Sequence, residues 1–150
     1  MLPVRFLMTT RAQLSESAGN EAGHTQLMRA ALQGQAEKVK KLLEGGADVD
    51  EADCEGRTAL MFAATNLHAN VVRTLMQYGA DVNVTANDGS TALLLAASSG
   101  DDESVRELLR YGANLSAKLK DTGKTALMLA DEKGYVNIVR LLQNASAEPR

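Results

Sequence analysis

The stretch Thr58-Ala-Leu-Met-Phe-Ala-Ala64 decides the fold, because it recurs at a fixed spacing along the chain. Related copies begin at Thr25, Thr91 and Thr125, and the four threonines are separated by 33, 33 and 34 residues. Such a period indicates a stack of similar units, each of which buries its apolar face against its neighbours.

Two other elements recur with the same period. An apolar element begins at Val39, Val72, Val105 and Val139, and a Gly-Ala loop element begins at Gly46, Gly79 and Gly112. Each unit therefore reads as helix, turn, helix and loop. The threonine can cap the first helix, and paired alanines such as Ala63 and Ala64 allow a neighbouring helix to approach closely.

The repeat also predicts turn and core residues. Glycine follows the first helix in three units, where it can adopt the left-handed conformation: Gly34, Gly100 and Gly134. Leu67 occupies this place in the second unit, so we expect that turn to differ slightly. The leucines expected to be buried between the inner units are Leu60, Leu75, Leu93 and Leu108.

These residues resemble the ankyrin repeat family, whose units of 33 residues carry a Thr-Pro-Leu-His-x-Ala signature. The resemblance covers about residues 20–145, although Ala or Gln replaces the signature proline and Met or Leu replaces the histidine. It implies an all-α ankyrin-repeat solenoid of helix-turn-helix units joined by β-hairpin-like loops. The expected domains are a flexible tail over 1–19, repeats over about 20–52, 53–85, 86–119 and 120–145, and a C-terminal tail over 146–150.

The ends of the array carry polar residues where inner units are apolar or less polar. Arg29 and Lys38 do so in the first unit, and Asp131 does so in the fourth. An open stack needs a polar outer face on its terminal units, so we interpret the four units as a complete array.

Composition limits the expected environment and partners. Apolar residues make up 45% of the chain and aromatic residues 3%, which predicts a core of Leu, Ala, Val and Met. The net charge is −3 with acids and bases interspersed, so nucleic acid is not an expected partner. No segment approaches the roughly 20 apolar residues that cross a membrane. The single Cys54 favours a reducing compartment, and we expect a cytoplasmic monomer. Arg5 and Arg11 leave an organelle-targeting tail as a less favoured alternative.

Motifs for catalysis, cofactors and metals are weak. Gly123-Lys124-Thr125 matches the end of a phosphate-binding loop, but Lys118 stands where the first glycine is needed. His24 and His68 have no metal-ligand partners at a suitable spacing. No nucleophile and base are paired in the sequence. We therefore expect no enzyme, cofactor or metal, and we favour an inert exposed thiol over a redox role for Cys54.

The favoured function is protein binding through the concave face and loop tips that the resemblance implies. Residues at these positions differ between units while the framework repeats. The predicted partner-binding residues are Cys54, Glu55, Arg57, Phe62, Thr65, Asn66, Asn87, Asp88, Ser90, Leu95, Ser98, Ser99, Asp121 and Lys124. The same positions in the outer units include His24 and Leu32.

Two questions stay open at this point. Phe62 is either an exposed interface anchor or a residue that packs between first helices, because its equivalents Arg29, Leu95 and Leu129 differ in type. The alternatives to a binding module are an engineered or purely structural repeat scaffold, and a regulatory subunit of an enzyme complex.

Overall fold

The computed structural model describes residues 24–147, in which it places eight helices. They are α2 (Gln26–Leu32), α3 (Ala36–Glu44), α4 (Ala59–Thr65), α5 (Ala69–Gln77), α6 (Ala92–Ser99), α7 (Asp102–Arg110), α8 (Ala126–Glu132) and α9 (Val136–Ala147). The predicted tail over 1–19 lies outside the described residues. Helix α9 extends two residues past the boundary expected at 145.

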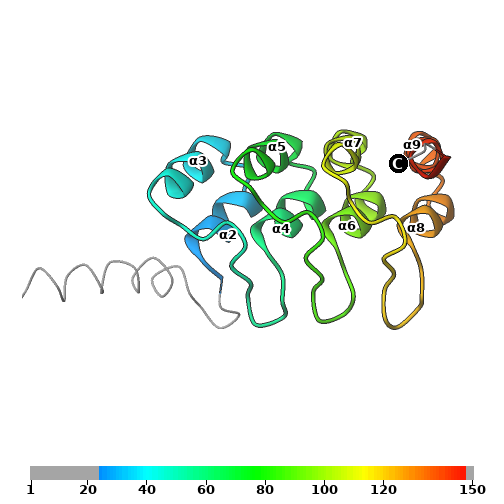
Figure 1. Ribbon diagram of the computed structural model, residues 1–150, viewed down its shortest axis with the longest axis horizontal. Coiled ribbons are helices and arrows are strands. Elements are labelled where there is room, and N and C mark those ends of the chain that lie inside the picture. Colours follow the sequence, from blue (N-terminus) through cyan, green and yellow to red (C-terminus); the bar gives the residue numbers. More distant parts are fainter. Residues whose placement is uncertain (1–23, 148–150) are drawn as a thin grey trace, which may run out of the picture.

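The helices form two parallel rows, as Figure 1 shows. The first helices α2, α4, α6 and α8 stack in one row, and the second helices α3, α5, α7 and α9 stack in the other. The main contacts among the described helices join partners within a unit or equivalent helices of adjacent units. This is the all-α repeat solenoid that the period predicts, and no described helix is long and apolar enough to cross a membrane.

The repeated threonine caps the first helix in three of the four units. The hydroxyl oxygen of Thr25 accepts a hydrogen bond from the Met28 N–H at 3.1 Å, and Thr91 and Thr125 do the same for their own helices. Thr58 makes no such bond at the start of α4. Its helix relies on burial instead, because every residue of α4 before Thr65 is buried.

The turn at Leu67 uses the left-handed backbone that glycine provides in the other three units. Leu67 has a φ of +66°, in the same left-handed region as Gly34, Gly100 and Gly134. Leu67 therefore keeps the left-handed backbone of the three glycines, while within the described part of the chain its N–H lacks the bond that the Gly34 and Gly134 N–H groups donate to the carbonyls of Ala31 and Asp131. A side chain with a Cβ pays a steric cost in this conformation, and Leu67 also leaves 55% of its surface exposed.

One continuous core runs along the stack between the two rows. Leu60, Leu75, Leu93 and Leu108 are all buried, which confirms the repeat register. The paired alanines Ala63 and Ala64 are fully buried, so adjacent first helices pack closely.

The terminal units differ from the inner ones. Lys38 of α3 is exposed, whereas the equivalent Val71 of α5 is buried. Leu127 and Met128 of α8 are exposed, although their equivalents Leu93 and Leu94 are covered by the following unit.

The loops between units project from the row of first helices as a series of fingers (Figure 1). Within the second finger, the Ala86 N–H donates to the Ser90 carbonyl at 2.8 Å, which closes a hairpin-like turn. Adjacent fingers are joined by backbone bonds, since the Asn87 N–H donates to the Glu55 carbonyl at 2.9 Å. The row of loops is thereby held in register with the helices.

Candidate protein-binding groove

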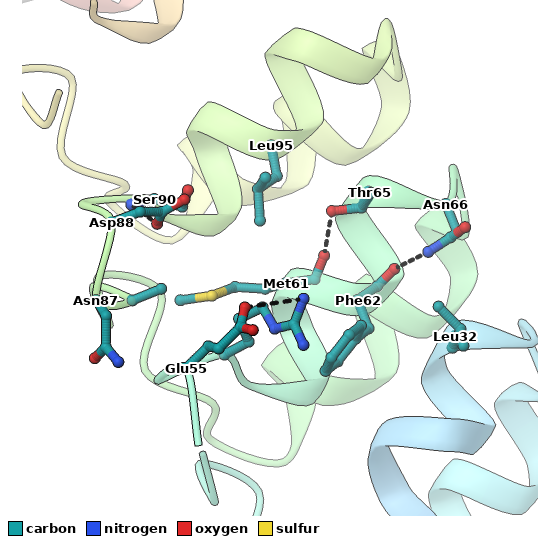
Figure 2. A pocket seen from close by; sticks show the side chains of 12 residues that line it. Leu32, Glu55, Met61, Phe62, Thr65, Asn66, Asn87, Asp88, Ser90 and Leu95 are labelled. Atoms are coloured by element: carbon teal, nitrogen blue, oxygen red, sulfur yellow. Dashed lines mark hydrogen bonds and ion pairs between the residues drawn. The ribbon is translucent and has the colours of Figure 1, made fainter. Parts of the chain in front are cut away.

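A groove of about 620 Å³ lies where the first helices of units 1 to 3 meet the loops (Figure 2). We refer to it as the groove. The residues that line it are Leu32, Glu55, Arg57, Met61, Phe62, Thr65, Asn66, Ala86, Asn87, Asp88, Ser90 and Leu95.

The groove has an apolar floor between two polar edges. Leu32 from α2, Phe62 from α4 and Leu95 from α6 supply the floor, one residue from each successive first helix. One edge is formed by the loops and the other by the end of α4, where Thr65 and Asn66 lie (Figure 2). An apolar floor with polar edges suits a segment that presents apolar side chains inward and its backbone to the edges.

Asp53 organises the loop side of the groove from beneath. Its carboxylate is inaccessible to solvent and accepts hydrogen bonds from the N–H groups of Glu55 at 2.9 Å and Arg57 at 2.8 Å. Arg57 Nε donates to the second carboxylate oxygen, Oδ2, at 2.9 Å. His24 Nε2 lies 3.4 Å from the same oxygen.

These hydrogen bonds keep Asp53 ionised. Burial alone would raise its pKa, but hydrogen bonds from the backbone and side chain of Arg57 and the backbone of Glu55 outweigh burial. The pKa of Asp53 therefore lies below its ordinary value of 3.8. The ionised carboxylate of Asp53 therefore holds the Arg57 side chain in place.

Arg57 and His24 enclose the ring of Phe62. The guanidinium carbon of Arg57 lies 5.0 Å from the ring centroid, within the range of a cation–π interaction. The His24 ring meets the Phe62 ring edge-on, with 5.0 Å between centroids. Only 9% of Phe62 is exposed. Phe62 therefore packs among its neighbours and does not protrude. The small part of its surface that stays exposed lines the groove.

The tips of the first two fingers present acidic side chains at equivalent positions. Glu55 and Asp88 are 33 residues apart and both immediately precede a loop glycine. Asn87 joins the two tips, because its Nδ2 donates to the Cys54 carbonyl at 3.3 Å. The backbone N–H and the hydroxyl of Ser90 lower the pKa of Asp88, with burial opposing them, so Asp88 is ionised at neutral pH.

Nine of the fourteen predicted binding residues line this groove. The other five lie elsewhere in the described residues: Cys54, Ser98, Ser99, Asp121 and Lys124. Cys54 is exposed beside the first fingertip, and Lys124 pairs with Glu132 of α8. Met61 and Ala86 line the groove but were not predicted, because Met61 stands at a position that is apolar in every unit and Ala86 is a small apolar residue that looks like framework.

The sequence also missed the role of Asp53. Its equivalents are Ala86 and Leu119, so a buried carboxylate breaks the pattern of the repeat at this position. An acid at an otherwise apolar position, followed four residues later by arginine, is the signal that could have revealed it. Among residues 24–147, no group of three His, Cys, Asp or Glu side chains is placed to hold a metal ion.

Comparison with known families gives one result. A model of ankyrin repeats, in three copies, matches residues 4–86 and again residues 81–150. The two matches together cover nearly the whole chain, including all eight described helices. A comparison with curated proteins gave no match.

Proposed function

This chain belongs to the ankyrin repeat family, and we propose that it is a module that binds a partner protein through the groove and the adjacent loop tips. One observation carries the proposal. The groove combines an apolar floor, contributed by three successive units, with side chains that differ from unit to unit at each edge. A rigid framework with variable positions gathered in one depression supports selective binding of a protein segment.

A function as a purely structural scaffold is less well supported. The Phe62 and Arg57 pair occupies positions that hold Leu95 and Ser90 in the next unit. The stack therefore forms at these places without an aromatic ring or an arginine. Such side chains are enriched where proteins bind other proteins.

The test compares Arg57→Ala with Arg106→Ala, a matched control on α7 that is 52% exposed and far along the chain from the groove. Wild type and both variants are used as bait in affinity capture from the source cells, and quantitative mass spectrometry identifies proteins that only Arg57→Ala loses. Titration calorimetry then measures binding of the identified partner. We expect Arg57→Ala to weaken binding by more than about 1 kcal/mol, as central interface residues do.

Phe62 needs a milder change than truncation to alanine. A buried phenylalanine reduced to alanine costs about 3–5 kcal/mol of stability, which would confuse loss of binding with loss of folding. Phe62→Leu keeps most of the buried volume and removes the ring beneath Arg57. Unchanged affinity in both Arg57→Ala and Phe62→Leu, with an unchanged circular-dichroism spectrum, would move the binding surface away from the groove.

A further inference from the structure

The donor groups on the side chains of the groove each make a hydrogen bond or close contact within the protein. Arg57 donates to Asp53 at 2.9 Å and approaches Glu55 at 3.5 Å. The Thr65 hydroxyl donates to the Met61 carbonyl at 2.9 Å. The amides follow the same rule: Asn66 Nδ2 donates to the Phe62 carbonyl at 2.8 Å, and Asn87 Nδ2 donates to the Cys54 carbonyl at 3.3 Å. The single O–H of Thr65 is thereby used, whereas the Arg57 guanidinium and the two amide groups keep further N–H donors.

Three acceptor groups of the groove are open to a partner. The Glu55 side chain is 63% exposed, and within the described part of the chain its carboxylate meets only Arg57, at 3.5 Å. Oδ1 of Asn66 accepts no hydrogen bond from the residues that the structure describes. Asp88 adds a second carboxylate at the neighbouring tip. The groove therefore presents open acceptors to a partner that carries hydrogen-bond donors.

The charge of the loops beside the groove also favours a partner with basic groups. Residues 45–58 carry five acids against one base, Arg57, and residues 78–91 carry two acids and no base. The Arg57 charge is already paired with Asp53 and Glu55. Residues 111–125 carry three lysines and one aspartate, and this positive loop adjoins the second fingertip, where the Lys120 N–H donates to the Asp88 carbonyl at 3.0 Å. The groove lies beside the two negative loops, which raises the local concentration of cationic groups.

We propose, building on the protein-binding function above, that the groove binds a partner segment in which a lysine or arginine stands next to a large apolar residue. The basic group hydrogen-bonds Glu55 and Asp88 at the two loop tips. The apolar side chain lies on the floor against Leu32, Phe62 and Leu95. Charge-assisted bonds to carboxylates are stronger and shorter than neutral ones, and two equivalent acids on adjacent fingers give the basic group a defined position.

The test uses an array of capped heptapeptides in which every pair of residue types occupies two central positions within a Gly-Ser background. The full-length labelled protein is applied at low and at high salt. We expect retention to be highest for Lys or Arg beside Leu, Met or Phe, and to fall at high salt because the tips are exposed. Preference for acidic pairs, or no preference among pairs, would overturn the proposal.

Two double variants test whether the preference for basic peptides depends on the acids at the two fingertips. Glu55→Gln with Asp88→Asn removes both charges while keeping the side-chain shapes and the oxygen that accepts from the Ser90 N–H. The control Glu37→Gln with Asp131→Asn removes the same charge from α3 and α8. Fluorescence anisotropy with the best Lys-Leu or Arg-Leu peptide should show about tenfold weaker binding for the tip variant and no change for the control.

The outcomes separate this inference from the function on which it rests. Peptides that bind with neutral or acidic side chains, and are lost in Phe62→Leu, would leave the groove as the binding site and refute the basic preference. Basic peptides unaffected by both the tip variant and Phe62→Leu would refute both. Basic peptides weakened by the tip variant alone would support the charge at the tips and contradict the apolar floor.

Discussion

The imidazole of His68 lies over Gly34 of the preceding unit, and its Nε2 is 3.0 Å from the Leu32 carbonyl oxygen. A Cβ added at Gly34 would come within 2.6 Å of this ring. This contact joins the first and second units and leaves no room for a side chain at Gly34. We expect Gly34→Ala to destabilise the protein by about 2–4 kcal/mol, through a left-handed φ of +75° and a clash with the ring.

Gly134→Ala is the matched control for this prediction. Its φ of +74° is nearly the same, but a Cβ there meets nothing within 4 Å. It should therefore cost only about 1–2 kcal/mol, the backbone part of the effect. Urea denaturation measures both variants. If His68→Ala does not reduce the cost of Gly34→Ala in a double-mutant cycle, the clash with the imidazole is not its cause.

Leu67→Gly is predicted to stabilise the protein. Leucine gains little from burial here, because 55% of it is exposed, and its φ of +66° is strained. Glycine relieves about 1–2 kcal/mol of backbone strain but adds the entropy cost of ordering a glycine. The free energy of unfolding should therefore rise by about 0.5–1 kcal/mol. Leu67→Ala serves as the control, since it keeps the strained Cβ. Equal stability of the glycine and alanine variants in chemical denaturation would argue against strain at this turn.

Leu93→Ala and Leu127→Ala test the register of the repeat at equivalent positions. Leu93 is 1% exposed between units, whereas Leu127 is 37% exposed on the last unit. Leu93→Ala should cost about 2–5 kcal/mol, as core truncations do, and Leu127→Ala should cost clearly less. Equilibrium unfolding compares the two. A loss below about 0.5 kcal/mol for Leu93→Ala, the range of ordinary surface changes, would contradict the register.

Asp53 makes stability depend on pH. Its pKa is lower in the folded protein than the ordinary value of 3.8, so the folded state binds its proton less readily than the unfolded chain does. The stabilisation is fully present above pH 3.8 and is lost as pH falls through the folded pKa. Asp53→Asn should reduce this acid dependence and cost about 1–3 kcal/mol at neutral pH.

The control for this prediction is Asp131→Asn, an exposed carboxylate on α8. Thermal unfolding followed from pH 7 down to pH 2 should show a smaller decrease below pH 3.8 for Asp53→Asn than for wild type and Asp131→Asn. Parallel decreases in all three proteins would mean that Asp53 carries no special share of the acid sensitivity.

The repeat made much of this fold predictable, because helix starts, buried leucines and turn glycines depend on residues within one unit. Thr25 and Leu93 behave as their positions imply. The cluster around Arg57 was not predictable in the same way. It depends on His24, which lies 33 residues away and reaches Arg57 only after two units stack.

Phe62 and Leu67 show two other limits of the sequence. The exposure of Phe62 is set by the side chains that cover it, which the repeat pattern does not specify. Leu67 follows the backbone of its equivalents because three other units fix the geometry of the stack, and the local preference of leucine is overridden.

Contacts limited to adjacent units mean that the groove and the fourth unit can lose structure separately. Helices α8 and α9 contribute no residue to the groove lining, and α8 has an exposed outer side. Fraying of these two helices, the kind of local opening that costs less than global unfolding, would leave α2, α4 and α6 in place. A molecule in which the fourth unit is unfolded could therefore still bind its partner. When the partner binds, amide hydrogen exchange would then slow in the first three units, while exchange in the fourth unit would stay as fast as before.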